Sequence, residues 1–485
     1  MIPNFCEVSY ILPSSQLTDI EGIMDLSNVD EWHTSPVESG HHWSQDFSLH
    51  LKPRIAHILT SRQSSSFVHL ILLNIPAKPN GIRLPIVAVY ISNESEVESV
   101  YDSLINDLQT EPRFDGFVLS VSCGSYEEYS ATSLLDRERT FDCFAQWGVS
   151  IGYQSSAATA GPILRNDVTG DHYVLTVAHV FKEKTDNDGQ KSSIVIPDRN
   201  GRVLTQPAYA DYLTEKNFLE RYLKRLDGPR GRLSTASAAA RPVLLHQIEE
   251  IKARLAELDV LGASLDEFAV RAKYGIVEQS KYGIHEYNGR RTFLDYSLIK
   301  ITDRKVDRDM FIWPIVPDPP VGQLSDHDWT NSAFQTLGGL SFDLDVWKRG
   351  RETSFTFGRV GGTEGLQVNE EAQITDEYWV LRDCSPNDTK SFAAPTDSGA
   401  LVVSRGGSGC GIVLGGWNRG GKAFKMPVDQ NRRLWDLKRL YDLRRPDGSL
   451  DLSNTICDLC HRGVVIISDL EMVLKNIGLN LSPVV

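Results

Sequence analysis

Hydrophobic and polar positions divide the chain into an irregular start, a short mixed region and a long β-rich region. Residues 1–50 are polar and unpatterned, so we expect a solvated loop there that includes His33, His41 and His42. Strands and one helix are predicted after it, because apolar runs alternate with a helical apolar stripe. The runs are 67–75, 84–91 and 117–121, and the stripe is 95–108. This order predicts a small α/β unit. It has no nucleotide-binding glycine motif, and docking or regulation is its expected role.

The β-rich region begins near Trp147 and is interrupted by a predicted helical hairpin at about 205–285. Its first half has apolar residues at helical spacing, and its second half alternates spacings of four and three, which is a heptad seam. The residues are Leu219, Tyr222 and Leu226, then Leu244, Ile248, Ile251, Leu255 and Leu258. The simplest interpretation is two antiparallel helices that pack on each other. A coiled coil that binds a protein partner is the alternative.

Two further stretches depart from the strand pattern. Residues 124–142 are rich in Ser, Glu, Tyr and Arg and are expected to be a linker. Residues 424–462 form a second interruption, with a basic amphipathic helix that ends at Pro446. A solvated helix face is the usual explanation of such a helix, and binding of an acidic partner or peptide is the alternative.

Composition restricts the class of protein. The chain has 485 residues, a net charge of −14 and 41% hydrophobic residues, which is typical of a globular protein and argues against non-specific nucleic-acid binding. No apolar run is long enough to cross a bilayer, and the start lacks a signal-peptide pattern, so we expect a cytoplasmic protein with no membrane partner. The seven cysteines are scattered, which favours a reducing compartment. Cys457, Cys460 and His461 spell a Cys-x-x-Cys-His pattern of the kind used for haem attachment, and they could also be half of a zinc site. Chance or packing is the favoured explanation, because no second cysteine pair is evident.

Three short segments carry candidate chemistry. His179 follows the apolar run 174–178, Asp295 begins a run to Ile301, and Ser398 lies in an Asp-Ser-Gly turn before another apolar run. Each segment alone has an ordinary structural explanation: a core histidine, a capping aspartate and a common turn. Together, the order His, Asp, Ser matches one known arrangement of the serine-hydrolase triad and differs from two others. An imidazole can take the proton of a serine hydroxyl, which is otherwise a poor nucleophile.

Residues 147–480 resemble the trypsin/chymotrypsin-like serine peptidases, of the intracellular kind found in filamentous fungi. Besides the triad segments, three stretches carry the resemblance: 346–360, 411–417 and 463–477. They are similar to a strand pair of the family's second barrel, to the strand after the nucleophile, and to the last strand with its C-terminal helix.

The resemblance implies a multidomain α+β protein. A chymotrypsin-like double β-barrel at 141–485 would carry the helical insertion 205–285 and the basic insertion 424–462. A small α/β domain at 1–140 would precede it. His179 would be the general base, Asp295 its orienting partner and Ser398 the nucleophile. The amides of Thr396 and Ser398 would form the oxyanion hole.

The resemblance also implies substrate contacts, with Phe392 in the primary specificity pocket and Val413, Leu414 and Gly415 along the substrate-pairing strand. Phe392 is not acidic, which argues against a preference for Arg or Lys.

Two residues depart from the family's pattern. Thr396 stands where the family has glycine, and the β-branched side chain restricts the backbone angles of that turn. Asp397 matches the residue that pairs with a freed N-terminus in digestive zymogens, yet no activation sequence lies near 147–152. We therefore expect Asp397 to have a different partner.

The sequence supports a serine endopeptidase that acts on peptide or protein substrates through an acyl-enzyme and uses no cofactor or metal. A weak or inactive pseudoprotease that serves as an interaction or regulatory module is the alternative, with partners bound through the helical hairpin or the N-terminal domain. An esterase-like hydrolase with the same triad is a further option.

Overall fold

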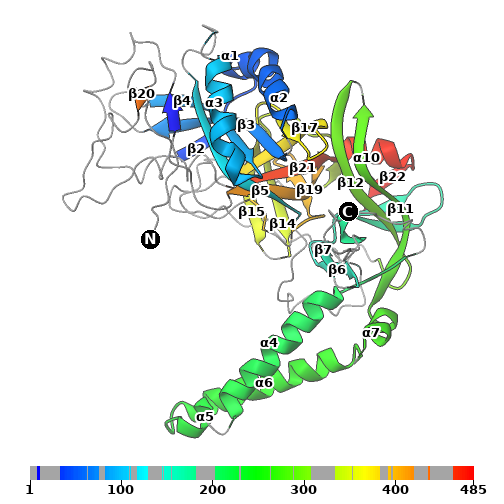
Figure 1. Cartoon of the computed structure of the whole chain (residues 1–485). Helices are drawn as coiled ribbons and strands as arrows, with labels where there is room; N and C mark the ends of the chain where they lie inside the picture. The colour runs from blue at the N-terminus through cyan, green and yellow to red at the C-terminus, as the bar shows by residue number, and fades with distance from the viewer. Residues whose placement is uncertain are drawn as a thin grey trace, which may run out of the picture.

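The computed structural model describes most of the residues on which these predictions rest. The described residues are 8–10, 33–62, 64–75, 82–108, 110, 117–128, 145, 147–154, 156–181, 202–228, 231–262, 264–287, 289–306, 334–351, 353–382, 392–394, 397–419, 435–436 and 463–484. Thr396, Cys457, Cys460 and His461 lie outside them, as does the basic stretch 432–445 apart from two residues. Those two, Trp435 and Asp436, form a short strand that pairs with residues 9–10, where the sequence predicted a helix. The fold is mixed α+β with most of its regular structure in two sheets (Figure 1).

The N-terminal unit is the α/β arrangement that the sequence predicts. Strand β4 pairs antiparallel with β3 and parallel with β5, and helix α3 makes the crossover between β4 and β5. Its elements are β1 (Val8–Tyr10), β2 (His33–Pro36), α1 (His42–Asp46), η2 (Phe47–Leu51), α2 (Lys52–Thr60), β3 (Ser66–Ile75), β4 (Ile82–Ile91), η3 (Glu94–Glu96), α3 (Val97–Leu108) and β5 (Val118–Glu128).

Part of the predicted N-terminal loop is ordered structure, so that expectation was wrong for residues 8–10 and 33–50. His33 lies in β2, which pairs with β3, and His42 begins α1. The physical reason is that Phe47 and Leu51 turn inward and are fully buried with Ile55 of α2. Two apolar residues in a polar stretch were enough to anchor it to the sheet.

One sheet of eight strands contains the residues around His179 and Asp295. Its order is β22-β8-β9-β12-β11-β10-β6-β7. The strands are β6 (Ser150–Tyr153), β7 (Ser156–Thr159), β8 (Ile163–Asn166), β9 (His172–Thr176), β10 (Val203–Thr205), β11 (Lys273–Tyr287), β12 (Arg290–Ile301) and β22 (Leu481–Pro483), and the short helix η5 (His179–Phe181) follows β9.

A second sheet contains the residues around Ser398. Within it, β14, β15, β17, β21, β19 and β18 pair in a closed ring. The elements are β13 (Thr336–Leu337), β14 (Asp345–Gly350), β15 (Ser354–Val360), β16 (Gly365–Val368), β17 (Ile374–Arg382), β18 (Leu401–Ser404), β19 (Ser408–Arg419), β20 (Trp435–Asp436), β21 (Val464–Asp469) and α10 (Leu470–Ile477). The predicted final helix is confirmed: Asp469 caps its first turn, and Gly478 ends it at a φ of 73°.

The N-terminal unit shares both hydrogen bonds and core with this second sheet. Strand β16 pairs with β3, and β5 pairs with β19. The first residues of the predicted linker, 124–128, are therefore strand. On one face of β4, Val87 and Val89 pack under α2 and α3, while Ala88 and Tyr90 on the other face join the core that includes Trp417.

The predicted helical hairpin projects from the sheets (Figure 1, green) and packs on itself, as expected. Helix α4 (Tyr209–Asp227) lies against α6 (Arg241–Asp259), with α5 (Arg232–Thr235) between them and α7 (Leu265–Arg271) after them. The heptad residues Ile248, Ile251 and Leu258 are buried against α4. The helical part ends earlier than predicted, because the residues from Lys273 pair with β12 as β11.

Candidate active site

The residues His179 and Asp295 are brought together by the pairing of β9 with β12. Ser297 lies opposite Thr176 in this ladder, so Asp295 lies beside the turn that follows β9. The Asp295 carboxylate accepts hydrogen bonds from the backbone N–H groups of Ala178 and His179 at Oδ1, at 2.6 and 2.9 Å. Its Oδ2 is 2.5 Å from His179 Nδ1. Both residues are only 2% exposed.

These contacts determine the chemistry of the imidazole. A carboxylate that receives two backbone N–H donors acts as an acceptor, so Nδ1 of a neutral His179 ring carries the hydrogen. The Nε2 atom is then the basic nitrogen. A buried carboxylate in this position also stabilises the imidazolium that forms when Nε2 takes a proton.

Ser398 lies in a turn between a buried aspartate and a strand of the second sheet. Its side chain is fully buried, and its hydroxyl donates to the carbonyl oxygen of Leu414 at 2.7 Å. Gly399 has a φ of 90°, in the left-handed region that favours glycine. Since a serine has a single hydroxyl hydrogen, the hydroxyl must turn away from Leu414 before it can donate to a base.

The turn of Ser398 contacts the eight-stranded sheet at Thr159 and Thr176, and Thr176 precedes His179 by three residues. The backbone N–H of Thr159 donates to the carbonyl of Ser398 at 2.7 Å, and the hydroxyl of Thr176 donates to the carbonyl of Thr159. A Cβ atom at Gly399 would lie 2.5 Å from the Thr176 hydroxyl. We call this contact between Thr159, Thr176 and the turn at Ser398 the seam. Thr176 is the last residue of β9 and His179 follows it by three residues, so the seam holds the turn of Ser398 beside the strand that leads into His179.

Asp397 has the alternative partner that the sequence required. Lys348 Nζ is 2.7 Å from its Oδ2, the Thr353 hydroxyl donates to the same oxygen at 2.6 Å, and the Ala394 N–H donates at 3.0 Å. Both charged side chains are fully buried. Burial opposes ionisation, but the charge of Lys348 and these hydrogen bonds outweigh it and hold the pKa of the Asp397 carboxyl below its usual range. The permanent ion pair therefore anchors the turn that presents Ser398.

Sequence reasoning missed Lys348 and Thr353, although a signal was present. Lys348 lies in the middle of β14, between Trp347 and Arg349, and is fully buried. A lysine is almost never fully buried unless its charge is paired. Gly350 gives the same indication, because a Cβ atom there would lie 2.0 Å from the Asp397 carboxylate.

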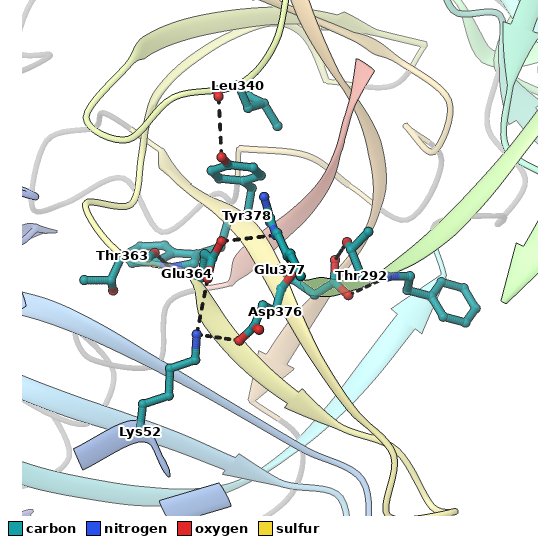
Figure 2. Close-up of polar contacts among 11 residues, drawn as sticks. Lys52, Thr292, Leu340, Thr363, Glu364, Asp376, Glu377 and Tyr378 are labelled. Carbon is teal, nitrogen blue, oxygen red and sulfur yellow. Dashed lines mark hydrogen bonds and ion pairs between the residues drawn. The ribbon is translucent and has the colours of Figure 1, made fainter. Parts of the chain in front are cut away.

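A third buried carboxyl connects the strand of Asp295 to the second sheet. Glu377 of β17 accepts from the Thr292 hydroxyl and from the Phe293 N–H, both at 2.8 Å (Figure 2). Burial raises the pKa of Glu377 to about 7. Nearby, Lys52 of α2 bridges Glu364 and Asp376, which ties the N-terminal unit to the same corner (Figure 2).

The predicted substrate contacts that the structure describes lie in two different settings. Phe392 is fully buried in the core of the ring, against Gly358 and near the Lys348 ammonium group. Val413, Leu414 and Gly415 lie in β19, directly beside the turn at Ser398. Thr396, predicted to supply one oxyanion-hole amide, lies outside the described residues.

Two kinds of feature, a cluster of metal ligands and a membrane-spanning helix, are absent from the described residues. Among the residues that the structure describes, no three His, Cys, Asp or Glu side chains gather as a metal site would require. No helix in the described part of the chain is both long and apolar enough to cross a membrane.

Comparisons with known proteins gave weak similarities to serine proteases. No family model and no curated protein matches the chain. Among solved structures, a glutamic acid-specific serine protease with a histidine triad in substrate binding has 13% identity and a TM-score of 0.29, over 70% of this chain and 98% of its own. Thermobifida fusca protease A has 11% identity and a TM-score of 0.28, over 69% and 96%. Nocardiopsis protease has 10% identity and a TM-score of 0.29, over 69% and 97%.

Proposed function

We propose that the chain is a serine endopeptidase whose triad is His179, Asp295 and Ser398. The observation that carries the proposal is the seam. It holds the turn of Ser398 against the strand that leads into His179, while Asp295 receives the His179 ring and two backbone N–H groups. In this proposal the eight-stranded sheet and the closed ring are the two barrels of a chymotrypsin-like fold, with the active site between them.

The chemistry follows from the hydrogen bonds. His179 Nε2 takes the hydroxyl proton of Ser398 as the oxygen attacks the scissile carbonyl, and Asp295 stabilises the imidazolium. The tetrahedral oxyanion is placed at the amide of Ser398, with the amide of Thr396 as the second donor. The imidazolium then gives its proton to the leaving amine, and a water molecule repeats the sequence to release the acyl group from Ser398.

Covalent labelling by a fluorophosphonate probe tests this function. The full chain should be labelled at Ser398, as located by mass spectrometry, and should hydrolyse reduced, carboxymethylated casein. Ser398→Ala and His179→Ala should abolish both. Ser404→Ala is a matched control, because Ser404 lies at the far end of β18 and its hydroxyl accepts from the Ser408 N–H. Labelling at another residue would contradict the assignment of Ser398 as the nucleophile. Folded protein with neither labelling nor hydrolysis would favour the non-catalytic interaction module.

A further inference from the structure

From Gly411 to Trp417, one edge of strand β19 is covered by a single strand, and its other edge is covered by two strands in succession. On its first edge it pairs with β21 from Gly411 to Trp417. On its second edge it pairs with β18, and this contact continues to Val413, which exchanges hydrogen bonds with Gly399 and Ala400. Beyond Val413 this edge has no further pairing with β18, because the segment that leads into β18 turns away from β19 at Ser398. The vacated edge is taken by β5 of the N-terminal unit.

The register of β5 on this edge leads directly to Ser398. The paired positions run antiparallel from Gly124 opposite Arg419 to Glu128 opposite Gly415. The next residue of β19 is Leu414, whose carbonyl oxygen accepts from the Ser398 hydroxyl. An extended peptide that binds an open strand edge pairs through its main chain, which makes such pairing tolerant of sequence. Any peptide bound in the position of 124–128 would therefore run toward the Ser398 hydroxyl.

We propose that Gly124–Glu128 occupy, within the same chain, the edge of β19 on which a peptide substrate pairs. The N-terminal unit and the substrate then compete for one strand edge, and hydrolysis requires these residues to leave it. This inference rests on the proposed peptidase function, and it gives the N-terminal unit a regulatory role at that site.

Side-chain packing holds the occupying strand in place. Trp417 of β19 is fully buried, and rings from three strands of the N-terminal unit surround it. Its ring centroid is 6.2 Å from Phe67, 6.0 Å from Tyr90 and 6.0 Å from Tyr126. The earlier part of β5 is anchored separately by parallel pairing with β4. Tethering of this kind gives the segment a high effective concentration at the edge, so a free peptide competes at a disadvantage.

The closed arrangement is also visible at the nucleophile. Ser398 has no exposed surface, and its hydroxyl donates to the carbonyl of Leu414. Leu414 is the residue next to Gly415, where the pairing with β5 ends. Departure of Gly124–Glu128 would free the main chain of β19 up to that carbonyl. Substrate pairing and reorientation of the Ser398 hydroxyl thus involve one short segment.

A reversible disulfide between the two strands tests the proposal. Ser125 lies opposite Asn418, and Ser125 is exposed, so Ser125→Cys with Asn418→Cys should form a cross-link under mild oxidation. The oxidised variant should hydrolyse carboxymethylated casein at least about tenfold more slowly than its reduced form, with full recovery on reduction. The matched control is Glu286→Cys with Arg291→Cys, an exposed opposed pair in the β11–β12 hairpin. Its hydrolysis rate should not depend on oxidation.

A release variant tests the opposite direction. Alternate residues of a strand direct their N–H groups to one neighbour, so Tyr126→Pro with Glu127→Pro removes a donor to β19 whichever of the two is used. The rate of fluorophosphonate labelling and kcat/KM for casein should both rise by about fivefold or more if the edge becomes available. Ser125→Ala, at the exposed position beside them, should change neither rate.

The outcomes separate this inference from the function on which it rests. Hydrolysis that is lost in Ser398→Ala but unaffected by the cross-link and by release overturns the inference and leaves the peptidase intact. Failure of the cysteine pair to cross-link also overturns it, because the strand pairing would then be absent in solution. If wild type, reduced and release proteins all lack Ser398-dependent labelling and hydrolysis, the peptidase proposal fails and the inference fails with it.

Discussion

The two sheets hold their halves of the candidate site in different ways, although each relies on a buried aspartate. Asp295 in the first sheet is compensated by backbone N–H groups and by the His179 ring, which becomes charged only when it takes a proton. Asp397 in the second sheet is paired with the permanent cation of Lys348. The first arrangement can respond to a proton transfer, whereas the second fixes a turn. In the proposed peptidase, this difference separates the half that takes part in proton transfer from the half that holds the nucleophile in place.

The largest effect is expected for Asp295→Asn. An asparagine cannot accept from both backbone N–H groups and also from His179 Nδ1, so the ring would lose the tautomer that makes Nε2 basic. Casein hydrolysis should fall by about 10³–10⁴-fold. The free energy of unfolding in urea should fall by only about 1–3 kcal/mol. A loss of activity no greater than the unfolded fraction would show that Asp295 supports the fold alone.

The next largest effect is expected for Lys348→Met, which leaves the buried Asp397 carboxylate without its cation. Breaking a buried pair on one side costs about 3–5 kcal/mol of folding free energy, which urea denaturation measures. The control is Lys300→Met, which removes a partly exposed ion pair to Asp171 and should change stability little. Equal stability of the two variants would contradict the supporting role of Lys348. The double variant Lys348→Met with Asp397→Leu should recover part of the loss.

A smaller, pH-dependent effect is expected for Glu377→Gln. Because the folded-state pKa of Glu377 is about 7 and an unfolded glutamate titrates near 4.3, the folded state binds more protons between these values. Its contribution to stability is therefore present at low pH and is lost as pH rises toward and above 7. Relative to the variant, wild type should lose roughly 1–3 kcal/mol between pH 5 and 8. Glu371→Gln, at an exposed position, is the control and should leave the wild-type pH dependence unchanged.

The smallest effect is expected for Thr353→Val. Its hydroxyl contacts both Asp397 and Lys348, and valine keeps the shape while removing the hydrogen bonds. The cost should be about 1 kcal/mol in urea denaturation, with casein hydrolysis reduced less than in Lys348→Met. If Thr353→Val were as damaging as Lys348→Met, the hydroxyl and not the cation would fix the turn.

Local patterns in the sequence predicted the elements and some of their packing. The apolar stripe at 95–108 became α3, and the heptad positions Ile248 and Ile251 became the buried face of α6. These predictions succeeded because the partners of each residue lie on the same or the next element. The triad of His179, Asp295 and Ser398 stays a prediction, although the predicted partnership of His179 with Asp295 agrees with their hydrogen bond.

Pairing between distant strands could not be derived in this way. Nothing in residues 124–128 indicates that they meet 415–419, because main-chain pairing leaves little trace in side-chain type. The same holds for β3 with β16. The placement of Lys348 beside Asp397 depends on β14 lying next to β18, and such a contact requires the whole sheet order. The role of Thr396 stays a prediction, as does the boundary at residue 140.

Shared strands make the N-terminal unit a poor candidate for removal. A chain that started after residue 140 would uncover the main chain of β19 and β16 along the edges that β5 and β3 now cover. It would also bare the indole of Trp417 and the rings around it. Unprotected strand edges beside apolar patches favour self-association. Such a shortened protein would tend to precipitate, so deregulated activity is better sought by point substitution within the intact polypeptide.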